Sequence, residues 1–434
     1  MRLSTGRKTR YGRWSSARRS AAFAASLGVL LGACGPVRTP APVTPPVSGE
    51  VPLVRVGVLV DSAQVELGAA TAFSLIDAAS GELLAREPAQ TRVRVTRDPA
   101  GGLVVSAGGS TYPVRERLTL RPENDGMVLI SGAPYRGTVT VVPGARGVTA
   151  INVVDMESYL LGVVPFEIGR VGEELFEASR AQAVAARTYA MRFLGRRSAL
   201  GFDVFATVDD QVYGGAGGEH EPVSAAVRAT RGELLTYRGE PIEALYHSTC
   251  AGVTAAIEEV WPEVPRPYLR SVVDTNPATG EAFDVSSSRF RWTTTWTADE
   301  LQTILNRTLA DSLSSTGVRG PGAIRSFEID RLTPSGRIGA MRIITDNGDF
   351  IVGGDRIRWI FPTPVGTILN SSKFDLRIES DTRGQLRTVT AEGMGWGHGI
   401  GMCQVGAMGR ARAGQDYRTI LSAYYRDTVL TRLY

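Results

Sequence analysis

A glycine-rich stretch near the end of the chain, residues 393–409, brings together several side chains that could do chemistry. Its sequence is GMGWGHGIGMCQVGAMG, in which Trp396, His398, Cys403 and Gln404 stand among seven glycines. The spacing matches neither GxGxxG nor a P-loop, so the signal for nucleotide binding is weak. Alternating glycines instead let a backbone lie against a flat ligand or a neighbouring strand. A structural glycine hairpin with a packed histidine is the competing interpretation.

A second group of reactive side chains lies in ALYHSTCAGVT, residues 244–254. His247 and Ser248 are adjacent in a predicted strand and point to opposite faces, so they cannot form a nucleophile and base pair. His247, Cys250, His398 and Cys403 are ligand types that zinc accepts, but no C-x₂-C or H-E-x-x-H pair accompanies them. We therefore expect no metal and no other cofactor. In an oxidising compartment Cys250 and Cys403 are a candidate disulfide, with free thiols as the alternative.

Glu167 is the acid whose surroundings best suit catalysis. It lies in GVVPFEIG, residues 162–169, where the neighbours are apolar. Such a setting raises the pKa of a carboxyl group and keeps it protonated near neutrality, which a general acid requires. A glutamate that caps or pairs near the following helix explains the same residues, and composition alone favours that simpler explanation.

The elements that must position these residues indicate an α+β fold. Residues 51–147 alternate β-branched residues with Gly, Pro and Asp breakers, which predicts a β-rich N-terminal region. Residues 173–194 are Ala-rich and acidic at the start, which predicts a central helix. We expect a mixed α/β core over 148–434, interrupted by an inserted α+β module over about 275–387 with a helix starting near Thr297.

The first 34 residues have the pattern of an export signal. Seven basic residues precede the apolar run AAFAASLGVLLGAC, which is too short to span a bilayer. Without those seven, the 48 Lys and Arg residues fall to 41 against 44 acids, a balance of −3. No basic field for nucleic acid remains, so we expect no nucleic-acid partner. Residues 35–50 are Pro-rich and predict an extended tether.

The end of that signal, Leu31-Gly32-Ala33-Cys34, resembles a bacterial lipobox. The resemblance implies that Cys34 receives a lipid and becomes the mature N-terminus, so that the protein is exported and anchored to a membrane, facing the periplasm or the cell wall. An ordinary secretory signal with a chance cysteine is the alternative.

Six segments in order are similar to the motif series of the stage II sporulation protein D and amidase enhancer (LytB-type) family. They are NVVDMESYLLGVVPFEIG, EASRAQAVAARTYAMRF, DQVYGG, ALYHSTCAGVT, EEVWPEVPRPYLRSVVD and GWGHGIGMCQVGAMG. The similarity runs from about Val51 to Tyr434, and the inserted module is its least distinctive part.

The resemblance implies a lytic transglycosylase that cleaves denuded peptidoglycan glycan strands and leaves 1,6-anhydro-muramoyl ends. Glu167 matches the catalytic acid and would serve as general acid and then base. The implied substrate-binding residues are Gln182, Arg187, Tyr213, His247, Thr249, Trp396, His398 and Gln404. Some family members are instead amidase enhancers, so the alternative is a non-catalytic lipoprotein scaffold that binds glycan or a cell-wall amidase.

The chain departs from the family pattern at three places. Glu167-Ile168-Gly169 replaces Glu-Met-Pro, and Cys250-Ala251-Gly252 replaces Ser-Gly-Gly. Cys403 takes the place of the serine in GMSQ. The two cysteine replacements fall in motifs that the resemblance places on one groove, which strengthens the expectation of a disulfide.

Overall fold

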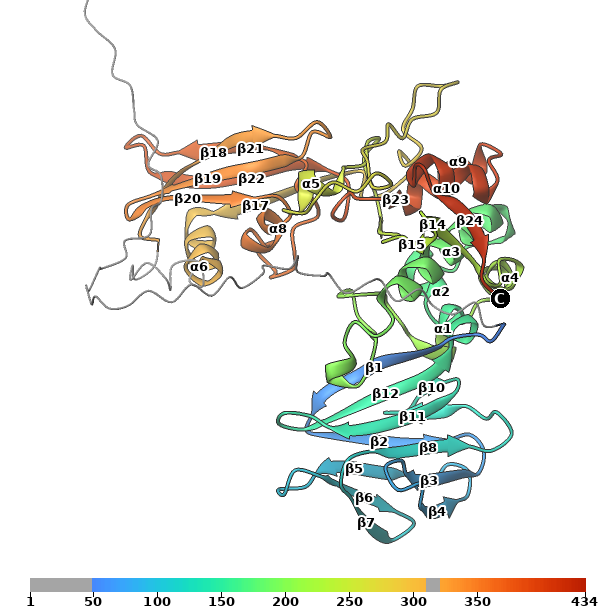
Figure 1. Cartoon of the computed structure of the whole chain (residues 1–434). Helices are drawn as coiled ribbons and strands as arrows, with labels where there is room; N and C mark the ends of the chain where they lie inside the picture. The colour runs from blue at the N-terminus through green and yellow to red at the C-terminus, as the bar shows by residue number, and fades with distance from the viewer. Residues whose placement is uncertain (1–48, 310–320) are drawn as a thin grey trace, which may run out of the picture. The chain divides into compact units, whose positions relative to one another are not determined.

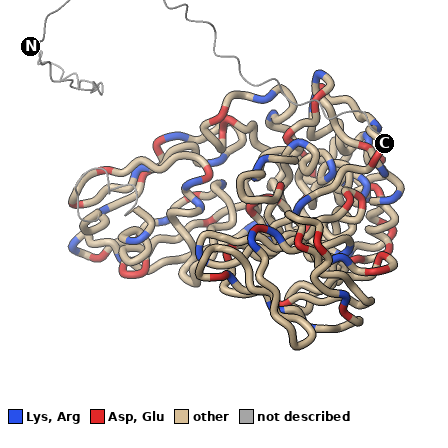
Figure 2. The backbone as a smooth tube through the Cα atoms, turned by 60° about the horizontal axis from the view of Figure 1, so that its bottom comes forward, with Lys and Arg blue, Asp and Glu red and all other residues tan. Residues whose placement is uncertain are grey.

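A computed structural model describes residues 49–309 and 321–434, and its elements are labelled in Figure 1. The predicted lipobox cysteine, Cys34, lies outside the described residues. No helix of the described part is both long enough and apolar enough to cross a bilayer. Acidic and basic residues are interspersed along the described chain in Figure 2.

The N-terminal region consists of two β-sheets, as the alternating sequence predicted, and their strands are antiparallel except where the later strand β13 (Val204–Phe205) joins β1 in parallel. One sheet has the order β13-β1-β12-β11-β8-β3-β4 and the other β10-β9-β2-β5-β6-β7. Strands such as β5 and β6 bury every second residue, so their apolar faces form the core. The strands are β1 (Leu53–Ser62), β2 (Gln64–Ala69), β3 (Phe73–Asp77), β4 (Leu83–Glu87), β5 (Val93–Arg97), β6 (Leu103–Ala107), β7 (Ser110–Val114), β8 (Leu118–Pro122), β9 (Val128–Ile130), β10 (Ala133–Tyr135), β11 (Thr138–Pro143) and β12 (Val148–Asp155).

The mixed core follows directly, because β12 ends at the residue that caps the first helix. The carboxylate of Asp155 accepts hydrogen bonds from the backbone N–H groups of Glu157 and Ser158. The elements up to the module are α1 (Met156–Leu161), α2 (Val164–Ile168), η1 (Glu173–Leu175), α3 (Phe176–Phe193), η2 (Ser198–Leu200), β13 (Val204–Phe205), η3 (Gly215–Gly218), α4 (Glu221–Ala229), β14 (Glu233–Tyr237), β15 (Glu240–Pro241), β16 (Tyr246–His247) and α5 (Ile257–Val260).

Helix α3 is the central helix that the Ala-rich sequence predicted. Its residues from 181 to 191 are all buried, and it contacts α4, α9, α10 and β14. Small side chains on every face let these neighbours approach closely. The C-terminal elements around it are β23 (Met402–Cys403), α9 (Gln404–Arg412), α10 (Tyr417–Tyr424) and β24 (Val429–Arg432). Strand β24 pairs with β14, so the end of the chain completes the core.

The inserted module has a hydrophobic core of its own, built from residues between Trp296 and Ala391. Its predicted helix begins where expected, with Thr297 as a cap that exchanges hydrogen bonds with Glu300. Two three-stranded sheets, β17-β22-β21 and β18-β19-β20, make up the rest. The elements are β17 (Arg291–Thr297), α6 (Ala298–Thr308), β18 (Ile324–Leu332), β19 (Ile338–Thr345), β20 (Gly348–Gly353), α8 (Arg356–Ile360), β21 (Phe374–Ser380) and β22 (Leu386–Met394).

Candidate functional site

Glu167 lies on the short helix α2, which packs against α3 and α4. Val164, Pro165 and Ile168 are buried and hold the helix in place. Phe166 and Glu167 face outward from that contact, with Phe166 exposed and Glu167 half-buried. The short helix therefore fixes the side chain, and the residue as a whole is only partly buried.

Hydrogen-bond donors from two distant segments hold the Glu167 carboxyl group. The backbone N–H of Val212 donates to Oε1 at 2.8 Å. The Gln404 side-chain amide donates to the Glu167 carbonyl oxygen at 3.0 Å and reaches Oε2 at 3.5 Å. The same amide lies 3.4 Å from Oε1 of Gln182. Glu167, Gln182 and Gln404, three predicted site residues, are thus brought together from α2, α3 and α9.

Burial raises the pKa of Glu167 to about 7, against hydrogen bonds from Val212, Gln404 and Tyr246 that lower it. Both the acid and its carboxylate are consequently present near neutral pH. A group in this state can give a proton and take one back, which is the requirement for a residue that acts first as acid and then as base.

Three further residues support Glu167 and were missed by the sequence analysis. Burial raises the pKa of Tyr246 well above its usual value, so its hydroxyl group stays protonated and can donate to Glu167. Gln211 donates to the Tyr246 hydroxyl oxygen at 2.9 Å and accepts from Tyr159 at 3.0 Å. Tyr246 lies 79 positions after Glu167 in the chain, and no motif in the sequence linked the two.

Arg187 and Tyr213, both predicted to bind substrate, lie elsewhere. Arg187 is fully buried, and its guanidinium group donates to both carboxylate oxygens of Glu157 at 2.8 Å. The Tyr213 hydroxyl group donates to Asn152 at 2.6 Å, and its ring packs against Tyr159. The structure does not bring either residue to the Glu167 carboxyl group. Both hold neighbouring elements together.

Thr249 and Trp396 meet each other rather than an open groove. Their backbones exchange hydrogen bonds of 3.0 and 2.9 Å, which ties the glycine-rich stretch to the segment after β16. Thr249 is fully buried, with its hydroxyl group 2.9 Å from that of Ser287. The guanidinium group of Arg289 covers the Trp396 ring at 3.9 Å. One face of this predicted stacking residue is therefore already occupied.

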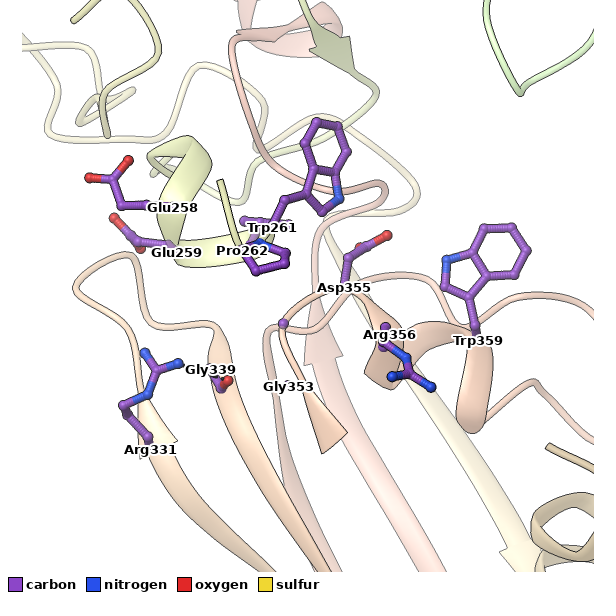
Figure 3. Close-up of a pocket in the computed structure, with 12 residues that line it drawn as sticks. Glu258, Glu259, Trp261, Pro262, Arg331, Gly339, Gly353, Asp355, Arg356 and Trp359 are labelled. Carbon is purple, nitrogen blue, oxygen red and sulfur yellow. Dashed lines mark hydrogen bonds between the residues drawn. The ribbon is translucent and has the colours of Figure 1, made fainter. Parts of the chain in front are cut away.

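His398 is held by the backbone and by aromatic neighbours. Its Nδ1 accepts from the N–H of Ile400 at 3.0 Å, and its ring lies 5.5 Å from His247 and 5.2 Å from Trp261, which Figure 3 labels. Burial lowers the pKa of His398 to about 4. The imidazole is neutral at pH 7 and joins the glycine-rich stretch to the segment after α5.

The glycines of that stretch serve the protein's own backbone. Gly397 and Gly401 have positive φ values, of 103° and 72°. A Cβ at Gly397 would meet the side chain of His247, and one at Gly401 would meet the carbonyl oxygen of Leu245. The sequence allowed these glycines to lie against either a flat ligand or a neighbouring strand. In the structure, Gly397 and Gly401 lie against β16 and the residue before it.

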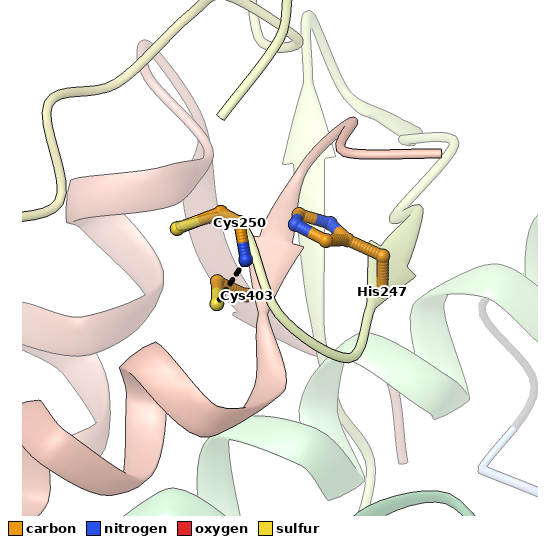
Figure 4. Close-up of side chains that lie close together, drawn as sticks. All are labelled: His247, Cys250 and Cys403. Atoms are coloured by element: carbon orange, nitrogen blue, oxygen red, sulfur yellow. Dashed lines mark hydrogen bonds between the residues drawn. The ribbon is translucent and has the colours of Figure 1, made fainter. Parts of the chain in front are cut away.

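His247, Cys250 and Cys403 form a buried cluster (Figure 4). Their donor atoms, one per residue, lie within 4.8 Å of one another, and both cysteines are free thiols. The Cys250 backbone N–H donates to the Cys403 sulfur at 3.2 Å. Burial raises the pKa of both thiols. The structure therefore places the sulfurs near each other without a bond between them.

His247, Cys250 and Cys403 are three of the four residues that the sequence analysis named as possible zinc ligands; the fourth is His398. Burial lowers the pKa of His247 well below its usual value, and its Nδ1 lies 3.1 Å from the carbonyl oxygen of Ile400. No described residue hydrogen-bonds to its buried Nε2. One neutral imidazole nitrogen and two cysteine sulfurs are donors that zinc accepts. The sequence lacked a spacing signature because the donors come from two segments about 150 residues apart.

In an oxidising compartment we expect Cys250 and Cys403 to be linked, since their sulfur atoms lie close together. Alkylation of unfolded, unreduced protein followed by peptide mass spectrometry should find neither thiol free. Cys403→Ser is the control and should leave Cys250 open to alkylation. Recovery of both cysteines alkylated contradicts the bond, and zinc released on unfolding of the same sample would assign the cluster to a metal.

Comparisons with known proteins place Glu167 and Gln182 within the span of one family model. A family model described as stage II sporulation protein matches residues 145–237, and one described as a domain of unknown function matches residues 278–401. Stage II sporulation protein D of Bacillus subtilis is 30% identical over 340 residues, 75% of this chain and 87% of that protein. An uncharacterized protein of Brachyspira hyodysenteriae is 33% identical over 69% of this chain and 73% of its own length. The amidase enhancer of Bacillus subtilis is 29% identical over 72% of this chain and 47% of its own length.

Proposed function

Because this chain belongs to the family of stage II sporulation protein D and the amidase enhancer, we propose that it cleaves peptidoglycan glycan strands as a lytic transglycosylase. The observation that carries the proposal is the state of Glu167. Its carboxyl group has a pKa raised to about 7 by burial and is held by donors from Val212 and Gln404. That state suits a single residue that transfers a proton in each of two steps.

In the first step the protonated Glu167 gives its proton to the oxygen that bridges a muramoyl unit and the next sugar. The bond from the muramoyl C1 to that oxygen breaks, and the leaving sugar departs with a new hydroxyl group. Positive charge develops at C1 and its ring oxygen. The N–H groups of Val212 and Gln404 stabilise the carboxylate that Glu167 becomes, because both donate toward its oxygens.

In the second step the Glu167 carboxylate removes the proton from the C6 hydroxyl group of the same muramoyl unit as O6 bonds to C1. The product is a 1,6-anhydro-muramoyl end, and Glu167 regains its proton. This route needs no second carboxylate as nucleophile, unlike a retaining hydrolase. In the described part of the chain, no second acid contributes to the pKa of Glu167, which fits a route with one acid.

The competing function is a scaffold that binds glycan or a cell-wall amidase without cutting. The similarity to a protein named amidase enhancer favours it, as does the tight structural use of Trp396 and His398. Denuded glycan strands incubated with the purified protein decide between the two. Anhydro-muramoyl ends detected by mass spectrometry support cleavage. Binding without such ends would support the scaffold.

We further propose that the protein is a lipoprotein anchored through Cys34 and facing the periplasm or cell wall. The motif LGAC after a short apolar run supports this, since acylation of that cysteine would hold the chain at a membrane. Cys34→Ser should leave the precursor uncleaved, which electrophoresis detects. The variant should also take up no lipid label and should no longer be retained by the membrane fraction. Normal processing and membrane retention of the variant would show that the lipobox assignment is wrong.

A further inference from the structure

A pocket of about 410 Å³ lies where the segment of α5 meets the inserted module. We call it the junction pocket. The residues that line it include Glu258, Glu259, Trp261, Asp355, Arg356 and Trp359. They are labelled in Figure 3.

The walls of the junction pocket are fixed by contacts between backbone segments. The backbone N–H of Asp355 donates to the carbonyl oxygen of Val260 at 3.0 Å. That of Ser335 donates to a carboxylate oxygen of Glu259 at 3.0 Å. Gly354 has a φ of 56° and no room for a Cβ beside Val260. The pocket is thus a preformed feature, as small-molecule sites generally are.

Two indole rings border this pocket. Trp359 is 60% exposed, although Ile357 and Ile360 on the same short helix are buried. In Figure 3 its ring points away from α8 on the Arg356 side of the pocket. Trp261 is partly buried on the other side and packs on His398. An exposed indole at a cavity offers a flat apolar face of the kind that covers the C–H face of a sugar ring.

Polar groups of both charges complete the junction pocket. One carboxylate oxygen of Glu258 pairs with Arg270 at 2.5 Å, whereas the other is buried without a hydrogen-bond donor among the described residues. Asp355, whose Oδ1 accepts from Arg358 at 3.0 Å, and Arg356 also line the pocket and carry acceptor and donor groups. This mixture suits a neutral ligand rich in hydroxyl and amide groups better than an anion or an apolar molecule.

Trp261 links the junction pocket to a neighbouring cavity. It also lines a second cavity, of about 730 Å³, whose wall includes Tyr189 of α3. The same helix carries Gln182, which lies in the Glu167 site. Gln182 and Tyr189 are seven positions apart, or about 10 Å along the helix axis. The two cavities therefore adjoin at Trp261, and the second borders the helix that carries Gln182, which gives room for a ligand of more than one sugar.

We propose that the junction pocket is a carbohydrate subsite that binds N-acetylhexosamine units of the glycan strand outside the cleaved bond, with Trp359 as the stacking platform. The proposal rests on the proposed function for the identity of its ligand, and it gives a role in substrate binding to the module that a domain of unknown function matches.

The test measures binding of chitohexaose and chitobiose to the purified full chain by isothermal titration calorimetry. Trp359→Ala should weaken chitohexaose binding about 10-fold, which matches the upper range of one lost aromatic contact. Chitobiose is too short to extend through both cavities, so it should bind the wild type more weakly than chitohexaose does. Trp359→Phe should retain most of the affinity because a ring remains.

Ile351→Ala is the matched control, since Ile351 is 61% exposed in the same module and does not line the pocket. It should bind chitohexaose as the wild type does, and all variants should keep the wild-type melting temperature. Unchanged chitohexaose affinity in Trp359→Ala, or no binding by the wild type, would overturn the proposal. If Trp359-dependent binding occurs without anhydro products, the subsite stands while the proposed function fails.

Discussion

Replacing Glu167 by glutamine lowers glycan cleavage by about 100-fold or more while glycan binding persists. Glutamine keeps the shape of the side chain and can still accept the hydrogen bond that the Val212 N–H gives to Glu167. It cannot supply a proton to the bridging oxygen. Release of anhydro-muramoyl ends per unit time, compared with strand binding in a sedimentation assay, measures the two effects separately.

The raised pKa of Glu167 also predicts how the activity and stability of the wild-type protein depend on pH. Only protonated Glu167 starts the reaction, so wild-type activity should fall about 10-fold per pH unit above the pKa of about 7. The folded protein also binds a proton that the unfolded chain has already released between the ordinary pKa near 4.5 and about 7. The free energy of unfolding therefore falls as pH rises through that window.

Glutamine does not titrate, so Glu167→Gln should lose this part of the pH dependence of stability. Urea denaturation at pH 5 and pH 8 should find the variant more stable than the wild type at pH 8. Lost activity together with gained stability is the expected combination for a desolvated catalytic acid. Full lytic activity in the variant would instead require another acid.

Replacing Glu157 by alanine destabilises the fold by about 3–5 kcal/mol, because it leaves the guanidinium group of Arg187 buried without its partner. Both Glu157 oxygens accept from Arg187, and one also accepts from the Tyr434 hydroxyl group at 2.6 Å. Two backbone carbonyl oxygens would remain as acceptors for Arg187. Urea denaturation followed by circular dichroism measures the loss.

The exposed pair Glu221 and Arg228 provides the matched control. Glu221→Ala removes the same kind of ion pair where water can solvate the arginine, so the expected change is below about 1 kcal/mol. Comparable effects at the two positions would contradict the buried-pair argument. If Glu157→Ala kept its stability and weakened glycan binding, Arg187 would be a substrate-binding residue as the sequence predicted.

Glu167 and Arg187 show what the sequence could and could not predict. The raised pKa of Glu167 could be predicted because the apolar residues around it are its neighbours in the chain. Burial in this setting is the main cause of the raised pKa. Gln404 and Gln182 were reached through the family motifs. The α+β fold class and the helices from 176 and 298 followed from composition, caps and period.

Arg187 shows why the remaining assignments could not be made. A charged residue inside an Ala-rich motif is equally consistent with a ligand contact and with a buried ion pair. The difference depends on Glu157, 30 residues earlier, and on the Tyr434 hydroxyl group near the chain end. Tyr246 was missed for a related reason, because its hydrogen bonds join segments whose approach only the tertiary fold reveals.

The pairing of the early acid with a late glutamine has a consequence for when the protein can act. Glu167 and Gln404 are 237 positions apart, and β14 gains its partner β24 only from the last residues. A chain that emerges from its amino end exposes the acid long before the groups that steady it exist. A truncated or half-made molecule carries the acid without the groups that hold it. Under the proposed function, the chain would therefore gain its activity only after the last residues have folded into place.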